Sequence, residues 1–599
     1  MMDAGKSAGP TGCPPVRVPA PRGLVMLLTL ATPLAAQIRF EDIAAKAGVR
    51  FELKNGAAGK FHQVELMPGG VAVLDYNNDG CLDIFFTNGA ELPSLRKSSP
   101  AFHNRLFRNN CNSTFTDVTD SAGVAGEGYS MAVAIGDYNN DGYPDIFVAG
   151  VDRNFLYQNQ GDGTFRDVTA AAGLTGVDPK YGKMWSISAG WFDADNDGKL
   201  DLFVSNYVGW DPATEPACGA PDHRFYCHPS NYPGRPHQLF HNNGDGTFTD
   251  ISASSGIANS IGKGMGVAFA DFNGDGLTDI FVANDSIRNF LFENKGHNKF
   301  EEVGLLRGVA FGEQGRAVAG MGVDFRDYDN DGLPDIVLTG MANDSFQLFR
   351  NVGKPAFFRD YTVRSGLALA TMNLTGWGTG MYDFDNDGRK DLFFANAHFP
   401  ELGPYLGTES PLPNSIFRNT GDGRFQDVSK EAGKDFQLAA YHRGVAFGDF
   451  DNDGRVDAVV SAIGGPARLF RNVTPRAGHW MAIKLVGRRS NREGLGAVVR
   501  LTLPGGETMY NHATTSVGYA SSSESLVRFG LGADAVAKRI EVRWPSGEVQ
   551  ELTEVAADRV VTITEPRPSP ASGETHPTQS ARPNPPAATK QAREPAAGP

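Results

Sequence analysis

The chain has 599 residues, with 55 Lys and Arg against 69 Asp and Glu, a formal net charge of −14, 72 Gly and 5 Cys. An acidic chain without a Lys/Arg-rich run lacks the basic face that nucleic-acid phosphates require, which excludes nucleic acid as a partner. Hydrophobic residues make up 41% of the chain and aromatic residues 10%, which is enough for a packed core and argues against general disorder.

The first 36 residues have the pattern of a secretory signal. Arg17 and Arg22 precede the apolar run LVMLLTLATPLA, and the small residues Ala35 and Ala36 follow it. This run has about a dozen residues, whereas a membrane span needs about 20, and no later stretch is long enough. We therefore predict a signal peptide over residues 1–36, no transmembrane segment, and a protein secreted to the periplasm or the extracellular space.

A nine-residue acidic loop, DxDxDGxxD or its Asn variant, occurs seven times. Successive copies begin 62, 56, 78, 56, 56 and 66 residues apart, a period typical of repeat arrays or propellers rather than of independent domains. The copies start at Asp75, Asp137, Asp193, Asp271, Asp327, Asp383 and Asp449.

Every acidic loop has the same neighbours. A short apolar strand such as GVAVLDY precedes it, and strands such as DIFFTN and RLFRN follow it. In the first six copies a Gly/Asn/Asp-rich turn then leads to a strand such as TFTDV, giving the four strands of a propeller blade. The seventh copy lacks this last strand, whereas an extra one, FED, begins at Phe40. We predict that residues 38–44 complete the seventh blade and leave no open sheet edge.

The predicted fold is all-β: a seven-bladed β-propeller over residues 37–475 followed by a small C-terminal β domain over residues 476–565. The strands of the second domain are MAIKLVG, AVVRLTL, LVRFGLG, RIEVRWP and VVTITE. We expect Trp480 and Trp544 to pack in its core, and we interpret SNREGLG and SVGYASSSE either as a pair of recognition loops or as ordinary loops. Residues 566–599, rich in Pro, Ala, Ser, Thr and Glu, are predicted to be a disordered tail.

The acidic loops have the ligand pattern of calcium sites. Oxygens at loop positions 1, 3, 5 and 9, a backbone carbonyl at position 7 and Gly at position 6 form the oxygen cage that Ca²⁺ prefers, whereas Mg²⁺ keeps several waters. Position 12, a bidentate Glu in an EF-hand, is apolar in every copy, so strands flank these loops. We predict up to seven structural Ca²⁺ ions, held by the following residues. They are Asp75, Asn77, Asp79, Cys81, Asp83, Asp137, Asn139, Asp141, Tyr143, Asp145, Asp193, Asp195, Asp197, Lys199, Asp201, Asp271, Asn273, Asp275, Leu277, Asp279, Asp327, Asp329, Asp331, Leu333, Asp335, Asp383, Asp385, Asp387, Arg389, Asp391, Asp449, Asp451, Asp453, Arg455 and Asp457.

The alternative is that these loops are Asp-rich turns that cap their own backbone without metal. Bare acidic clusters would repel strongly at short range. Seven divalent ions would add a charge of +14 and cancel the formal −14 of the whole sequence. This agreement favours the metal interpretation.

Four cysteines follow the signal, and exported cysteines usually form disulfides. Cys81 lies in the first acidic loop and Cys111 in the hairpin between strands three and four of the same blade, so the two turns lie on the same side and a disulfide is expected. Cys218 and Cys227 are expected to form a second disulfide. The alternative for this pair is a metal site that includes His223, His228 or His237.

The acidic loops, with their LFRN and Phe-x-Asp strands, resemble the FG-GAP or VCBS repeats of integrin α-subunit propellers. The segments HWMAIKLVGRRSNREGLGAVVRL, SVGYASSSE, VRFGLG and IEVRWPSGEVQ resemble the ASPIC/UnbV domain. The combination is similar to the cartilage acidic protein family, a resemblance that implies an exported calcium-binding protein. Animal members generally add an EGF-like module with six cysteines, for which the four mature cysteines leave no room, so the resemblance implies a bacterial-type member.

No GxSxG, HExxH or P-loop motif is present, so whether the protein is an enzyme stays open, with a non-enzymatic role favoured. The first hypothesis is a calcium-binding platform for binding, cell adhesion or interaction. The second is a periplasmic or secreted enzyme or biosynthetic accessory that acts on a small molecule or polysaccharide at the propeller mouth.

A protein or glycan ligand is expected on the face opposite the calcium loops, because connecting loops commonly carry recognition. Long connections are expected there over residues 90–104, 207–237 and 397–414. Their aromatic residues are Trp210, Phe225, Tyr226, Tyr232, Phe399 and Tyr405.

Residues before the innermost strands either ring the central mouth or simply pack between strands. They are His62, Lys183, Trp185, Lys263, Arg316, Trp377, His442 and Arg443. Met131, Met265 and Met321 recur six residues before their loops and are interpreted as core residues rather than Cu(I) ligands.

Overall fold

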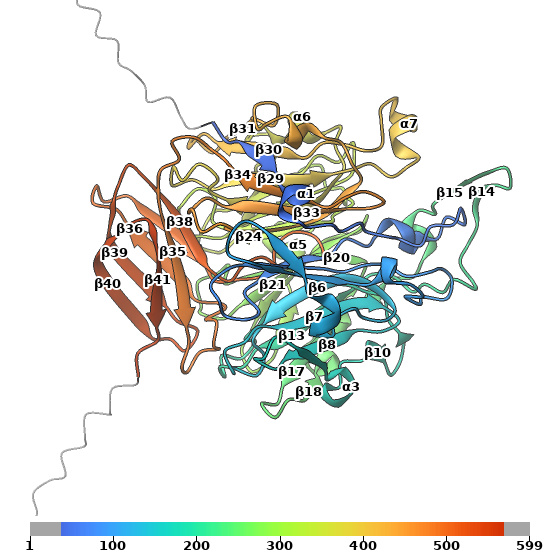
Figure 1. Ribbon diagram of the computed structural model, residues 1–599, viewed down its shortest axis with the longest axis horizontal. Helices are drawn as coiled ribbons and strands as arrows, with labels where there is room; N and C mark the ends of the chain where they lie inside the picture. The colour runs from blue at the N-terminus through green and yellow to red at the C-terminus, as the bar shows by residue number, and fades with distance from the viewer. Residues whose placement is uncertain (1–36, 568–599) are drawn as a thin grey trace, which may run out of the picture. The chain divides into compact units, whose positions relative to one another are not determined.

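The computed structural model describes residues 37–567. The predicted signal peptide, and the predicted tail apart from its first two residues, lie outside these residues. Within residues 37–567, seven antiparallel four-stranded sheets form the blades of a propeller, which confirms the predicted fold class (Figure 1). In each blade the strand before the acidic loop is innermost.

The blades are as follows, from the inner to the outer strand. Blade 1 is β2 (Val71–Leu74), β3 (Asp83–Phe86), β4 (Arg105–Asn109) and β5 (Phe115–Asp117). Blade 2 is β6 (Tyr129–Gly136), β7 (Asp145–Val151), β8 (Phe155–Asn159) and β9 (Phe165–Asp167). Blade 3 is β12 (Ser186–Phe192), β13 (Asp201–Asn206), β17 (Gln238–Asn242) and β18 (Phe248–Asp250). Blade 4 is β20 (Gly264–Ala270), β21 (Asp279–Asn284), β22 (Phe290–Asn294) and β23 (Phe300–Glu302).

The remaining blades follow the same order. Blade 5 is β24 (Val323–Arg326), β25 (Asp335–Leu338), β26 (Gln347–Asn351) and β27 (Phe358–Asp360). Blade 6 is β28 (Gly376–Tyr382), β29 (Asp391–Asn396), β30 (Ser415–Asn419) and β31 (Phe425–Asp427). Blade 7 is β32 (His442–Gly448), β33 (Asp457–Ala462), β34 (Arg468–Asn472) and β1 (Phe40–Asp42).

The ring is closed by the first strand of the chain. β1 pairs antiparallel with β34, with Phe40 opposite Asn472, so the N-terminal strand supplies the outer strand of blade 7 as predicted. The inner strands contact one another in order around the ring, and β2 contacts both β6 and β32. Closure therefore leaves the inner strands with neighbours on both sides.

A short α-helix follows the outer strand in blades 1 to 5 and in blade 7, whereas α7 (Leu402–Leu406) lies between the second and third strands of blade 6. An Asp at the end of the outer strand commonly caps the next turn. In blade 1, Oδ1 of Asp117 accepts a hydrogen bond from the backbone N–H of Thr119. The α-helices are α1 (Ala44–Ala47), α2 (Thr119–Ala122), α3 (Thr169–Ala172), α4 (Ser252–Ser255), α5 (Gly304–Arg307), α6 (Leu367–Thr371) and α7 (Leu402–Leu406).

The hydrophobic core lies between neighbouring blades. One cluster combines Ala72 and Leu74 of blade 1 with Val133 and Ile135 of blade 2. Apolar residues on both faces of each sheet are buried in this way, because each blade packs against a neighbour on either side. This explains why the strands read as continuous apolar runs.

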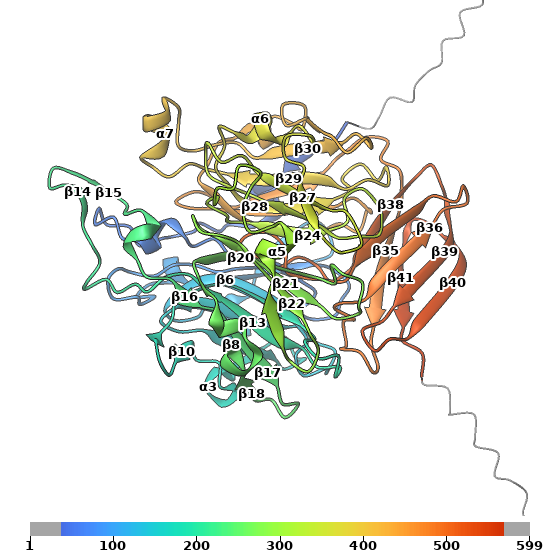
Figure 2. The same ribbon diagram turned by 180° about the vertical axis from the view of Figure 1, so that it is seen from behind.

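The C-terminal domain contains two sheets, with the strand orders β38-β35-β41 and β37-β36-β39-β40. Its strands are β35 (His479–Val486), β36 (Val498–Thr502), β37 (Thr508–His512), β38 (Val527–Gly532), β39 (Val536–Arg543), β40 (Val549–Ala556) and β41 (Arg559–Thr564). Trp544 is buried, whereas Trp480 is partly exposed. The domain lies on one side of the propeller, and α7 and the hairpin of β14 (Cys218–Ala220) and β15 (His223–Phe225) lie on the other (Figures 1 and 2).

Candidate functional site

The acidic loops join the first and second strands of every blade. Position 9 of each loop is the first residue of the second strand, so that Asp83, for example, begins β3. This Asp is buried, and its two oxygens accept backbone N–H bonds from Tyr76 at 3.1 Å and from Asn109 of β4 at 2.7 Å. The same pair of bonds recurs in all seven loops and ties the loop to the third strand.

The other ligand positions are also oriented by the backbone of their own loop. Oδ2 of Asp75, at position 1, accepts the N–H of Gly80 at 3.0 Å. Oδ1 of Asp79, at position 5, accepts the N–H of Cys81 at 2.9 Å. The bend requires Gly80 because its φ is 84°, in the left-handed region. Each loop thus folds around a pocket lined by oxygen atoms.

In four loops, the carboxylate at position 3 has an oxygen without any partner among the described residues. These are the Oδ1 atoms of Asp195, Asp329, Asp385 and Asp451, all of which are buried. In the loops that begin at Asp193, Asp327 and Asp383, carboxylate oxygens of positions 1, 3 and 9 lie within 4.8 Å of one another. A buried carboxylate oxygen without a donor is costly unless a cation is bound, so this donor set fits Ca²⁺.

Two of these carboxylates are held from behind by an arginine on the third strand. Nε of Arg350 donates to Oδ2 of Asp329 at 2.6 Å, and Nε of Arg418 donates to Oδ2 of Asp385 at 2.8 Å. Each arginine also bonds the Asp at position 5 of its loop. In both pairs the arginine bonds Oδ2 of the Asp and leaves Oδ1 unpaired. This is expected for a group that orients a metal ligand without binding the metal itself.

The three loops with Asn at position 3 differ from these four. Nδ2 of Asn77 donates to Oδ2 of Asp79 at 2.8 Å, and Asn139 and Asn273 make the equivalent bonds to Asp141 and Asp275. The ligands of these loops therefore partly satisfy one another. We infer two classes of loop, of which the four with Asp at position 3 are the better cation sites.

Burial and neighbouring carboxylates raise the pKa of several carboxyl groups of the loops. Burial raises the pKa of Asp83 to about 8, against the hydrogen bonds from Asn109 and Tyr76. Burial and the neighbouring charge of Asp201 raise the pKa of Asp193 to about 7. Burial also raises the pKa of Asp391 well above its ordinary value, with Asp385 and Asp383 adding to the shift. A divalent cation would reverse these shifts, because it stabilises the ionised form.

Two sets of asparagines missed by the sequence analysis join the blades around the ring. The Asn that ends each third strand donates from Nδ2 to the carbonyl of loop position 2 in the preceding blade, as Asn109 does to Phe450 at 2.9 Å. All seven blades have this bond. In six loops the Asn at position 4 donates to the Gly carbonyl of the next loop, as Asn452 does to Gly80. The repetition of LFRN in the sequence was the signal that could have pointed to the third-strand Asn.

The C-terminal domain contacts the face that carries the acidic loops. Nη2 of Arg543 donates to Oδ2 of Asp271 at 2.8 Å, and Oε2 of Glu493 accepts the backbone N–H of Asp137 at 3.0 Å. Arg528 lies 3.4 Å from Oδ2 of Asp449. The candidate metal loops are therefore part of the interface between the two domains.

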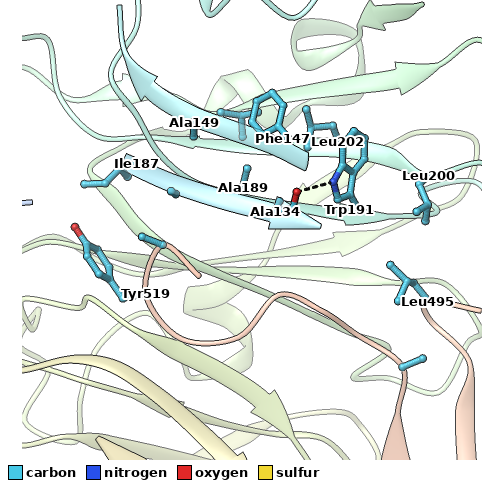
Figure 3. Packing of buried hydrophobic residues seen from close by; sticks show 14 of the residues in the cluster. Ala134, Phe147, Ala149, Ile187, Ala189, Trp191, Leu200, Leu202, Leu495 and Tyr519 are labelled. Carbon is cyan, nitrogen blue, oxygen red and sulfur yellow. Dashed lines mark hydrogen bonds between the residues drawn. The ribbon is translucent and has the colours of Figure 1, made fainter. Parts of the chain in front are cut away.

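The segment 513–524 of the C-terminal domain enters the centre of the propeller. The backbone N–H groups of Val133 and Val323 donate to the carbonyls of Ala520 and Gly518, at 3.1 and 3.2 Å. Tyr519 is fully buried, and Figure 3 shows it beside the inner-strand residue Ile187. SVGYASSSE is thus neither an exposed recognition loop nor an ordinary surface loop, because its polar groups bond to the inner strands.

At the opposite face the propeller mouth contains a pocket of about 740 Å³. Of the predicted aromatic residues, Phe225, Tyr226, Phe399 and Tyr405 line it, whereas Tyr232 is buried and Trp210 packs on Trp185. Of the residues expected at the mouth, Trp377 lines the pocket. Met265 and Met321 also line it, and Met131 is buried in the core.

Both predicted disulfides are present. Cys81 pairs with Cys111, and Cys218 pairs with Cys227. The alternative of a metal site at Cys218 and Cys227 is wrong, because both sulfurs are bonded to each other.

The FG-GAP-like repeat family matches residues 75–148, 137–204, 230–282, 271–338, 327–394 and 383–460, and the family described as ASPIC and UnbV matches residues 487–570. These matches cover the acidic loops and the second domain. The chain belongs to the FG-GAP-like repeat family and carries a C-terminal ASPIC/UnbV domain.

The chain is similar in sequence to proteins named cartilage acidic protein 1. Cartilage acidic protein 1 of Mus musculus is 26% identical over 330 residues, 53% of this chain and 47% of that protein. The Homo sapiens protein is 27% identical over 314 residues, 50% of this chain and 43% of that protein. The Xenopus tropicalis protein is 25% identical over 504 residues, 80% of this chain and 70% of that protein. The chain thus spans about half the length of the two mammalian relatives.

Solved structures resemble the chain more distantly. One is an Agrocybe aegerita lectin that recognises non-reducing terminal N-acetylglucosamine, with a TM-score of 0.36 and 15% identity over 67% of this chain and 86% of the lectin. Another is YCF48 bound to D1 peptide, with a TM-score of 0.37 and 8% identity over 74% of this chain and 99% of that one. Among residues 37–567, no helix combines the length and apolar character needed to cross a membrane.

Proposed function

We propose that the protein is an exported calcium-binding β-propeller that acts as a binding platform. The observation that carries the calcium assignment is the unpartnered, buried carboxylate oxygen at position 3 of four loops. Positions 1, 3, 5 and 9 would hold the ion, with the carbonyl of position 7. Its role would be to neutralise the carboxylates that join the first two strands of each blade.

Export is supported by the signal-like pattern at the N-terminus and by the two disulfides. The platform role is supported by the mouth opposite the acidic loops, where two long connections place aromatic residues around a single pocket. Tyr405 is 86% exposed and Phe225 is 42% exposed, which is unusual for large apolar side chains unless they contact a partner.

Equilibrium dialysis of a protein comprising residues 37–599 against ⁴⁵Ca²⁺ tests the calcium assignment. We expect several ions per chain and a rise in melting temperature on binding. Folded protein without bound calcium at millimolar supply would contradict it.

Two matched variants, Tyr405→Ala and Leu369→Ala, test the platform role in a thermal-shift screen of small molecules and soluble glycans. Leu369 is equally exposed, at 82%, but does not line the pocket. We expect to find ligands that raise the melting temperature of the unchanged protein and of Leu369→Ala but not that of Tyr405→Ala.

A further inference from the structure

The C-terminal domain supports the inner part of the pocket at the propeller mouth. Met67 and Trp377 line its inner part. The hydroxyl of Tyr519 donates to the carbonyl of Met67 at 2.6 Å, and the Tyr519 ring meets Trp377 edge-on at 5.2 Å. The segment 513–524 therefore supports the inner part of the pocket from within the channel, and residues of α7 line its outer part.

The wall of the pocket is largely apolar and aromatic. Its lining includes the four methionines Met67, Met265, Met321 and Met341, together with Leu66, Leu402, Trp377, Phe225 and Phe399. The volume of about 740 Å³ is that of a site for a drug-sized molecule. A wall of this kind desolvates a hydrophobic body and offers few partners for the many hydroxyls of a sugar. These properties favour an apolar ligand over a glycan.

The fixed charges of the lining are acidic. Asp285 and Glu401 line the pocket, and no Lys or Arg does. Asp285 is buried and accepts hydrogen bonds from the hydroxyls of Tyr207 at 2.6 Å and Ser286 at 2.8 Å. The charges that act on Glu401 are those of Glu65 and of His223, which also lines the pocket. No Lys or Arg of the lining neutralises the Glu401 carboxylate, so this edge of the apolar pocket attracts a cation.

Two cations lie behind the lining: Lys263, which donates to the carbonyl of Pro229 at 2.7 Å and lies near Asp285, and Arg443. The Arg443 guanidinium stacks 3.9 Å above the Trp377 ring and donates to the backbone carbonyls of Leu66 and His442. The side chain of Arg443 is buried, at 1% exposed, and it does not line the pocket. It thus fixes the position of Trp377 from outside the lining.

We propose that this pocket binds an apolar or aromatic molecule that carries one ammonium group, with the apolar body against the methionines and Trp377 and the ammonium near Glu401. The rings of Phe399 and Tyr405, which also line the pocket, would pack against the apolar body. The proposal rests on the platform role proposed above, since it names the class of ligand that the mouth takes.

Isothermal titration calorimetry with three probes of the same shape tests the proposal: 2-naphthylmethylammonium, 2-naphthylmethanol and 2-naphthoate. We expect the ammonium to bind at least about five times as tightly as the alcohol, and the carboxylate to bind most weakly. Glu401→Gln should remove the advantage of the ammonium over the alcohol. Glu409→Gln is the matched control, because Glu409 is an exposed acid of the same connection that does not line the pocket.

Tyr405→Ala provides a second variant, which should weaken all three probes to a similar degree. Preferred binding of 2-naphthoate, or an ammonium advantage that survives Glu401→Gln, overturns the ligand class while leaving a binding site at the mouth. Absence of binding by all three probes also overturns it. The calcium content of the same samples is read separately, so failure of the ligand class is distinguishable from failure of the calcium platform.

Discussion

At the residue scale, the carboxylate at position 3 distinguishes the loops from one another. Where it is Asp, one oxygen is buried without a donor, and where it is Asn, the amide bonds the neighbouring Asp. Arg350 and Arg418 then face the loops with the larger number of carboxylates. In these two blades the third strand thus supplies a group that orients the carboxylates of the loop.

Replacement of Asp385 tests this role directly. Asp385→Ala removes the unpartnered oxygen of the sixth loop, so we expect one Ca²⁺ fewer per chain and a lower melting temperature in calcium, by metal analysis and calorimetry. Asp422→Ala, at an exposed acid in the next turn of the same blade, is the control and should keep the full calcium content. An unchanged calcium content in Asp385→Ala would contradict the assignment.

The ligand positions could be predicted because carboxylate chemistry and its spacing are visible in a single loop. The roles of the third-strand Asn and of the Asn at position 4 could not be predicted, since each bonds a carbonyl of a different blade. Their function depends on which repeats become neighbours, and Asn is common in turns for local reasons. Repetition signalled that Asn109 and its equivalents matter without indicating what they contact.

At the element scale, the third-strand Asn joins each blade to the one before it. Asn109→Ala removes the two bonds that Nδ2 donates to the carbonyls of Leu82 and Phe450 and the bond that Oδ1 accepts from the backbone N–H of Cys111. We expect a loss of about 1–3 kcal/mol in the free energy of unfolding, measured by urea denaturation. Asn110→Ala, at the adjacent and more exposed position, should cost less than half as much. Equal effects of the two substitutions would argue against an inter-blade role.

The inserted segment 513–524 behaves as an additional element of the propeller. Tyr519 is fully buried, so Tyr519→Ala should lower the free energy of unfolding by about 3–5 kcal/mol, as truncation of a large core side chain does. Tyr519→Phe removes only the bond to Met67 and should cost about 1 kcal/mol. Urea denaturation of both variants measures this, and near-native stability of Tyr519→Ala would place the side chain outside the core.

Most strands could be predicted from their apolar runs, but β37 and β40 of the C-terminal domain and the short strands of the connections, such as β14 and β15, were missed. β40 contains Glu551 and Glu554 and is largely exposed, so it lacks a clear apolar face. The position of the segment 513–524 had no local signal either. Its polar and Gly-rich composition is that of a surface loop, and only its contacts with inner strands explain why Ser and Gly are suitable there.

At the scale of the whole molecule, the loops link calcium, protons and stability. In chelator, the folded chain holds Asp83 with a pKa of about 8 and Asp193 with a pKa of about 7, whereas the ordinary value is 3.8. At pH values between the ordinary pKa and these raised pKa values, the folded state therefore binds more protons than the unfolded state. The free energy of unfolding should fall as the pH rises through this range. Calcium, which needs ionised carboxylates, should restore stability most strongly at the upper end.

Calorimetry at about pH 6 and about pH 8.5, with chelator or with excess calcium, checks this expectation. We expect the calcium-induced rise in melting temperature to be larger at the higher pH. A rise that is the same at both pH values would indicate that the buried carboxylates do not take part in calcium binding.

The pairing of β1 with β34 has a consequence for how the chain assembles. Phe40 meets Asn472, so the earliest strand must wait for nearly all the blades to be made before it finds its partner. The segment 513–524 comes later still, and it bonds inner strands of several blades at once. Contacts between such distant parts of a chain form slowly. The ribosome therefore releases the last stretch needed to complete the centre of the molecule only after every blade has emerged.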